Sequence, residues 1–194
     1  MSWTVSRTRL ASVVLAVVLV TLAAVAYRVT DSESRYELVP APLDTDVSYE
    51  SGSLRVSDVR VADQIQLGRA FLRTQGMFVV VHVTLSASGR DSLLISDTRV
   101  LSSSGTTYAS ALSLGQVTKA EPGFETSRDY VFEVDPTRID DLTLEVWNVG
   151  VLAAYYERTR TPLGITAGNA ARWAEAGRGR TVPVPTDEVT RALP

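Results

Sequence analysis

Few side chains in this sequence could perform catalysis or hold a metal ion. His82 is the only histidine, Lys119 is the only lysine, and there is no cysteine. One histidine without cysteine cannot build the common types of zinc site. The sequence also contains no motif for a serine nucleophile, a zinc protease or a phosphate-binding loop. We therefore expect no catalytic residue, no metal site and no cofactor, and we keep an unrecognised enzyme only as an unfavoured alternative.

Two short acidic segments could in principle offer oxygen ligands to calcium. Asp44 and Asp46 lie in one of them, and Asp140 and Asp141 lie in the other. Calcium takes about six to eight oxygen ligands, and neither segment has the spacing of a calcium-binding loop. We interpret both as solvated acids.

The chain begins with a long apolar run, and the predicted strands and helix come after it. Residues 10–26 read LASVVLAVVLVTLAAVA, without a charge, a proline or a glycine. A helix through them would be roughly 26 Å long, close to the ~30 Å hydrocarbon core of a bilayer. Arg7 and Arg9 precede the run, and cationic flanks stay on the cytoplasmic side. The pattern predicts a cytoplasmic stub at 1–9 and a transmembrane signal anchor at 10–27, with the remainder outside the cell.

A cleaved signal peptide is the competing interpretation of the same run. Ala24, Val25 and Ala26 resemble an A-x-A cleavage site. The run is longer than the usual apolar part of a signal peptide, about 7–15 residues, and this favours retention. Cleavage would release a secreted soluble domain, so both outcomes stay open.

The charge of the chain argues against a nucleic-acid partner. The whole sequence has a net charge of −3, and two of its arginines precede the apolar run, so the remainder carries −5. Such a surface should be repelled by phosphate backbones. We expect no nucleic-acid binding.

The exported part has three predicted regions: a spacer at 28–47, a β-sandwich domain at 48–160, and a C-terminal extension at 161–194. The spacer includes an apolar piece, 36–39, that could add an edge strand. In the extension, a short helix at 167–176 would start at the N-cap Thr166 and end at Gly177. We expect residues 181–185 to be extended and the final residues to be disordered.

Alternation with a period of two dominates the predicted domain. In the segment 77–85, one face is purely apolar and should point into a core; it consists of Met77, Val79, Val81, Val83 and Leu85. His82 and Thr84 fall on the opposite, outward face. Similar alternation predicts strands at 124–134 and 142–147.

Several shorter signals complete the pattern. In the first strand the apolar residues are even-numbered up to Val56 and odd-numbered from Val59 on. A single bulge near Ser57 and Asp58 would let both sets face the same side. Short strands are predicted at 93–95, 98–101 and 106–109, with a hairpin turn at 102–105, and Pro122-Gly123 marks another turn. Many short strands without helical periodicity predict an all-β fold, an immunoglobulin-like antiparallel β-sandwich.

A family resemblance supports this fold. The segment 76–85 (GMFVVVHVTL) resembles a strand of a bacterial extracellular immunoglobulin-like family known as the immunoprotective extracellular domain, whose function is unknown. The order of later motifs is similar: GTTY at 105–108, PG at 122–123, VFEVDP at 131–136 and LTLEV at 142–146. The resemblance covers roughly residues 50–148 and departs at 85–88, where the family usually has an asparagine. It implies an anchored β-sandwich outside the cell and no catalytic residues.

Exposed aromatic and apolar side chains could form a surface for a partner. The candidate contact residues are Phe78, Val80, Trp147, Tyr155, Tyr156 and Trp173. The alternative is that Trp173 and its helix simply cap the sandwich, and that loops cover Phe78 and Val80. From these observations we expect a single-pass plasma-membrane protein with an extracytoplasmic binding or scaffolding domain. Its partner would be an envelope or membrane protein, such as a transporter or assembly complex.

Overall fold

The computed structural model describes residues 13–23, 36–112, 117–148 and 156–194. The chain divides into two compact units, Met1–Tyr36 and Glu37–Pro194. In the first unit, residues 13–23 are helical and their side chains are exposed. Among the described residues, no helix is both long and apolar enough to cross a membrane. Part of the predicted membrane segment, 10–27, lies outside the described residues.

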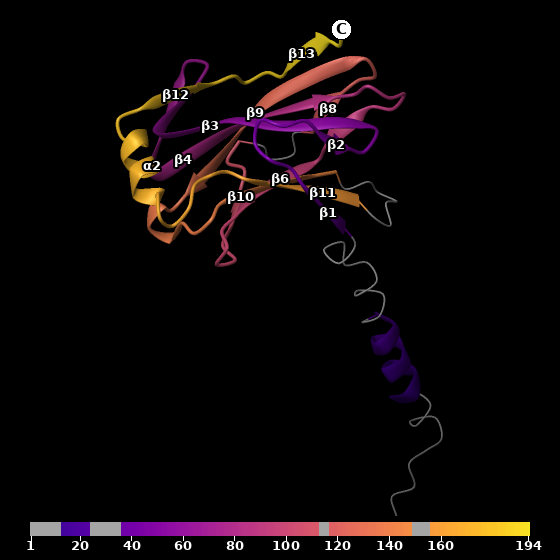
Figure 1. Ribbon diagram of the computed structural model, residues 1–194. Coiled ribbons are helices and arrows are strands. Elements are labelled where there is room, and N and C mark those ends of the chain that lie inside the picture. Colours follow the sequence, from indigo (N-terminus) through magenta and orange to yellow (C-terminus); the bar gives the residue numbers. More distant parts are fainter. Residues whose placement is uncertain (1–12, 24–35, 113–116, 149–155) are drawn as a thin grey trace, which may run out of the picture. The chain divides into compact units, whose positions relative to one another are not determined.

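The second unit is a β-sandwich of two larger sheets (Figure 1). The five-stranded sheet has the order β1 (Tyr36–Pro40), β11 (Tyr156–Pro162), β10 (Thr143–Trp147), β6 (Asp97–Leu101) and β7 (Thr107–Ala109). The six-stranded sheet has the order β12 (Thr181–Val184), β3 (Gly52–Leu67), β4 (Ala70–Ser86), β9 (Phe124–Val134) and β13 (Val189–Ala192), and β2 (Val47–Tyr49) pairs with β3. A small third sheet joins β5 (Leu93–Ile95) to β8 (Thr118–Ala120), and two short helices, η2 (Pro136–Arg138) and α2 (Ala170–Gly177), complete the unit.

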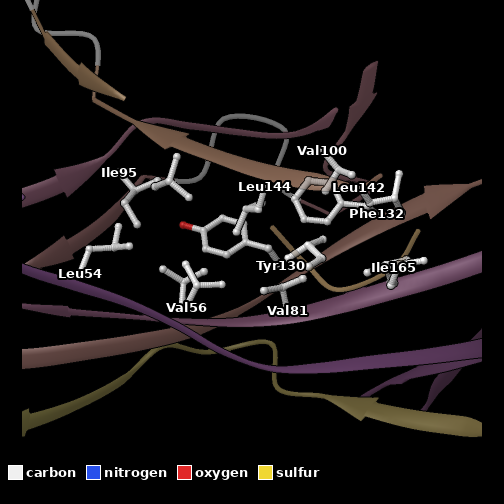
Figure 2. Packing of buried hydrophobic residues seen from close by; sticks show 14 of the residues in the cluster. Leu54, Val56, Val81, Ile95, Val100, Tyr130, Phe132, Leu142, Leu144 and Ile165 are labelled. Carbon is white, nitrogen blue, oxygen red and sulfur yellow. The ribbon is translucent and has the colours of Figure 1, made fainter. Parts of the chain in front are cut away.

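The core between the two larger sheets confirms the period-two prediction. All five residues of the predicted apolar face of β4 are buried, with at most 2% of their surface exposed; they are Met77, Val79, Val81, Val83 and Leu85. The five-stranded sheet contributes Val100, Leu144 and Val146 to the same cluster. Figure 2 shows side chains from several strands meeting in this core, with Phe132 and Tyr130 of β9 among them.

The predicted bulge in β3 is also present. Ser57 pairs with His82 and Arg60 pairs with Val80, so β3 has one residue more than β4 across this step. Asp58 has a φ of +48°, in the left-handed region. Because of this extra residue, Val56 and Val61 both face the core although their numbers differ in parity.

The predicted turns are found where expected. β6 and β7 form a hairpin around residues 102–106, with Gly105 at φ +92°. Gly123, at φ +81°, follows Pro122 in the turn that leads into β9. The predicted edge strand at 36–39 corresponds to β1 beside β11.

The C-terminal region differs from its prediction. The segment predicted to be extended, 181–185, contains β12, which pairs with β3, whereas the predicted disordered end instead forms β13, which pairs with β9. The β12–β3 pair is parallel, so the sandwich is not wholly antiparallel as expected. The chain reaches β12 through α2, and a helical crossover can bring a strand back in parallel orientation, whereas a tight hairpin cannot.

The short helix begins later than the sequence predicts. Its N-cap is Asn169, and Thr166 lies upstream of it. The Asn169 side chain instead accepts a hydrogen bond from the Thr166 backbone N–H at 2.7 Å. Asn169 thus closes the loop before the helix, and Gly177 is the last residue of α2.

Candidate functional site

A pocket opens on the outer face of the six-stranded sheet, away from the core. It has a volume of about 490 Å³ and is lined by residues of β3, β4 and β9 and by the C-terminal segment. Pro183, Pro185 and Val189 supply an apolar wall, and His82, Asp129 and Arg60 supply polar groups. The volume lies within the range of about 300–1,000 Å³ that is typical of small-molecule sites.

Asp129 is the centre of the polar side of this pocket. Its side chain is only 5% exposed, and it holds His82 and Arg60 together. The His82 Nδ1 lies 2.7 Å from one carboxylate oxygen, and an Arg60 Nη lies 2.7 Å from the other. The Arg60 Nε is also 3.0 Å from a carboxylate oxygen of Asp58.

The β3 bulge explains how Arg60 reaches this face. Without the extra residue, Arg60 would share the parity of Leu54 and Val56 and would point into the core. With the bulge, Arg60 lies opposite Val80 on the outer face, one pairing step from His82. Asp129 lies directly opposite His82 in β9. A local irregularity of the strand therefore assembles three residues that are far apart in the sequence.

The electrostatics of the cluster keep Asp129 in its ionised, hydrogen-bond-accepting form. Burial acts to raise the pKa of the Asp129 carboxyl, but the hydrogen bonds and charges of His82 and Arg60 outweigh burial and hold the pKa below its ordinary value. An ionised carboxylate can only accept hydrogen bonds, so the His82 Nδ1 carries the proton. Among the residues that the structure describes, His82 hydrogen-bonds the Asp129 carboxylate and no serine hydroxyl.

The lowered pKa of Asp129 predicts an acid-dependent loss of stability. A carboxyl whose folded-state pKa is depressed stabilises the fold above its unfolded value, here 3.8, and this contribution is lost as the pH falls through the folded-state pKa. Asp129→Asn should therefore be less stable than the wild type at neutral pH, and the difference should shrink below about pH 4. Urea unfolding of both proteins across this range measures it. A difference that is constant with pH would contradict the charge network.

A second charged cluster lies on the outer face of the five-stranded sheet. Glu145, whose side chain is 0% exposed, accepts from the Arg99 Nε at 2.9 Å, from an Arg158 Nη at 3.3 Å and from the Arg160 Nε at 3.0 Å. The Arg158 guanidinium also lies over the Trp147 ring, 4.4 Å from its centroid. This distance is typical of a cation–π contact.

The charge balance around Glu145 favours a structural role. Burial acts to raise the pKa of the Glu145 carboxyl, but Arg160 and Arg99 outweigh burial and leave the pKa below its ordinary value. Glu145 and Arg158 are almost fully buried, so neither is accessible to a ligand. We interpret this cluster as the ionic support of the five-stranded sheet.

Phe78 and Val80 do not form the exposed contact surface considered from the sequence. Phe78 is 4% exposed and Val80 is 0% exposed, in a second apolar cluster on the outer face of the six-stranded sheet. Val182 and Val184 of β12 belong to the same cluster and are also buried. The proposal that these two residues are exposed is wrong, because the C-terminal region packs over them.

The four aromatic candidates do not form an exposed patch either, as far as the structure describes them. Trp147 and Tyr156 are 6% and 8% exposed and contact the Arg158 guanidinium. Trp173 is half-buried against the main core, as expected for a helix that caps the sandwich, and it also lines a smaller pocket of about 360 Å³. Tyr155 lies outside the described residues.

Three of the remaining chemical candidates have ordinary side-chain partners. Asp46 pairs with Arg55, Asp140 accepts a hydrogen bond from Ser102 at 3.4 Å, and Lys119 pairs with Glu121 at 2.6 Å. Within the described ranges, no group of three or more histidine or acidic side chains could hold a metal ion.

Sequence reasoning missed Asp129 and Arg60. Asp129 stands in an unremarkable R-D-Y segment, and Arg60 follows the bulge. One signal was present in the sequence. Asp129 and Val131 are two residues apart in one strand, and Val80 and His82 are two residues apart in the other, so each pair lies on one face of its strand. This signal points to one pocket only when the β4–β9 register is known.

Comparisons with known proteins assign no function to this chain. No protein-family model matches the chain, and no curated protein matches it. It is similar to an uncharacterized β-sandwich protein from Clostridium difficile 630, with 8% identity, a TM-score of 0.43, and 66% of this chain and 96% of that chain covered. It is also similar to the yjhA protein from Bacillus subtilis, with 8% identity and a TM-score of 0.46. The similarity covers 62% of this chain and 99% of that chain.

Proposed function

We propose that this chain is a membrane-anchored, extracytoplasmic binding module of the bacterial cell envelope. The apolar run at residues 10–26, joined to a compact β-sandwich, is the observation that carries the proposal. In the part of the run that the structure describes, the side chains are exposed; Leu15, Leu19 and Leu22 are 57–60% exposed. Burying such a helix among lipid tails is favourable, because each leucine removed from water contributes about 1.5–3 kcal/mol.

The pocket on the outer face of the six-stranded sheet supports binding as the activity of the domain. It offers an imidazole nitrogen from His82 and an apolar wall that includes Pro183 and Pro185. A rigid pocket with a few oriented polar groups is the usual form of a ligand site. We propose binding over catalysis, since the described residues place no nucleophile in a hydrogen bond with His82.

The finer assignment of the fold belongs to this proposal too. We propose that the sandwich is immunoglobulin-like and related to the immunoprotective extracellular domain family. The motifs that resemble this family lie in β4, in the β6–β7 hairpin, in β9 and in β10. A domain of this kind would serve as an accessory subunit of an envelope transporter or assembly complex.

The mature form of the protein tests the anchor. We expect an intact amino terminus by mass spectrometry, and we expect the full chain to stay in the membrane pellet after alkaline carbonate extraction. Leu15→Arg together with Leu19→Arg should move the chain to the soluble fraction, because each arginine at the helix centre costs about 2.5–3.5 kcal/mol on insertion scales.

Other outcomes separate the alternatives. A mature chain that begins after Ala26 would replace the anchored module with a secreted soluble domain. Purification from detergent-solubilised membranes should recover a stoichiometric envelope partner. Repeated recovery of the chain alone would contradict the accessory role while leaving the anchor intact.

A further inference from the structure

The outer end of the β3–β4 hairpin, residues 64–73, extends beyond β9, and we call it the arm. Pairing between β4 and β9 begins at Met77 opposite Val134, so the first residues of β4 run past the end of β9. From Ala70 to Arg73, β4 pairs with β3. Within the described residues, no strand pairs with the other edge of this segment. Figure 1 shows this arm beside β12, at the end of the domain away from β1.

The tip of the arm exposes apolar side chains. All six residues 68–73 are exposed, and Phe71 and Leu72 are 57% and 43% exposed. Adjacent residues of a strand point to opposite faces, so this edge carries apolar surface on both sides. Exposed apolar edges promote pairing with another strand, and proteins usually blunt them.

The backbone of the arm also has groups directed to the free edge. Gly68, at φ +57°, and Arg69 form a two-residue turn between the paired residues Leu67 and Ala70. Residues that flank such a turn bond across the hairpin, and the next residue along each strand directs its N–H and C=O outward. Phe71 and Arg73 therefore present hydrogen-bonding groups to any strand that arrives.

The charge of the arm is opposite to that of the domain. Between positions 64 and 75 the charged residues are Arg69 and Arg73, so this segment has a charge of +2. The chain as a whole has a net charge of −3. Both arginines are exposed, and the Arg73 Nε donates to the Gln64 side chain at 3.1 Å. In the described part of the chain, no carboxylate forms an ion pair with either of them. These two positive charges are available to a partner.

We propose that the free edge of β4, from Ala70 to Arg73, binds an extended acidic segment of a partner protein by strand addition. The partner's backbone would pair with Phe71 and Arg73, its carboxylates would approach Arg69 and Arg73, and its apolar side chains would cover Phe71 and Leu72. Backbone pairing of this kind supplies affinity, and the alternating side chains supply specificity.

Two other occupants fit less well. A second copy pairing antiparallel about Leu72 would place Arg73 of each copy opposite Phe71 of the other, so the arginines of both copies would gather on one ribbon without a carboxylate to compensate them. A lipid surface would leave the outward backbone groups unpaired, at a cost for each one buried.

Site-specific photocrosslinking in native membranes tests the proposal with the full-length chain. A benzophenone amino acid in place of Leu72 is the probe, and the crosslinked peptide is sequenced. We expect adducts with an acid-rich segment of another protein. Arg69→Glu with Arg73→Glu should lower the yield about tenfold, since reversing two exposed ion pairs costs of order 1–2 kcal/mol. Arg90→Glu, the same change at an exposed arginine elsewhere, should leave the yield unchanged.

A matched pair of variants tests the backbone contribution. Phe71→Ala removes the ring and keeps the N–H, whereas Phe71→Pro removes both, so proline should abolish adducts that alanine only reduces. Thermal unfolding of each variant verifies that the sandwich is folded. Equal yields for alanine and proline, adducts with lipid, or adducts only between copies of this chain would each overturn the proposal. The test does not depend on the pocket at His82.

Discussion

Glu145→Ala is expected to lower the free energy of unfolding by about 3–5 kcal/mol, the usual cost of removing one partner from a buried ion network. Glu145 neutralises part of the charge of three arginines, and one of them, Arg158, is 1% exposed. Without the carboxylate, the Arg158 guanidinium remains in a poorly solvated site, where it contacts the rings of Trp147 and Tyr156 and donates to the Tyr156 hydroxyl at 2.6 Å. Urea unfolding at neutral pH measures the loss.

Glu133→Ala is the matched control for this prediction. Glu133 is an exposed strand glutamate on β9, and its loss should cost no more than about 1 kcal/mol. Glu145→Gln keeps the size of the side chain and loses the charge. Its loss of unfolding free energy should therefore fall between those of Glu145→Ala and Glu133→Ala. Equal stability of the Glu145→Ala and Glu133→Ala variants would show that the arginines find other compensation.

The buried core could be predicted from the sequence because its signal is local. In the segment from Met77 to Leu85, every second residue is apolar, and a strand with one buried face needs nothing else. The change of parity after Val56 even predicted the position of the bulge, because only an extra residue lets both halves of β3 face the same core.

The outer faces could not be predicted in the same way. Phe78 and Val80 lie on the outer face of β4. The strand that covers this face, β12, is about a hundred residues later in the sequence. The cover itself has a local signal, since Val182 and Val184 alternate with Thr181 and Pro183. Nothing near residue 182 indicates which strand β12 will join, and the parallel pairing with β3 depends on the path through α2.

The candidate site shows the same limit. His82 was correctly placed on the outward face beside Thr84, and its partner Asp129 was not anticipated. The two residues meet because β4 and β9 pair in one particular register. Glu145 alternates with the core residues Leu144 and Val146 and lies on the outer face; its burial depends on arginines of the neighbouring strands β6 and β11. Charge networks across strands are properties of register, which a single sequence specifies only weakly.

Val182→Asp is expected to cost about 4 kcal/mol or more, because it buries an unpaired charge. Val182 is 2% exposed and lies in the second apolar cluster with Ile65, Phe78 and Val80. A charge there should detach β12 from β3 and expose the outer face of the six-stranded sheet. Val182→Ala, which only deletes methyl groups, should cost about 2 kcal/mol. Urea unfolding gives the free energies, and binding of a hydrophobic dye reports the exposed face.

The same substitution at an exposed valine separates the effect of burial from the effect of charge. Val189 is 44% exposed and belongs to the same C-terminal region, so Val189→Asp should change the stability by less than about 1 kcal/mol and should not increase dye binding. Hydrogen exchange can then show where the Val182→Asp variant opens. Loss of protection in β12 and in the adjoining part of β3, with the main core still protected, would identify the C-terminal region as a separately detachable cover. Equal behaviour of the two aspartate variants would mean that Val182 and its neighbours do not hold the C-terminal region on the sheet, and that Phe78 and Val80 must be covered by other contacts.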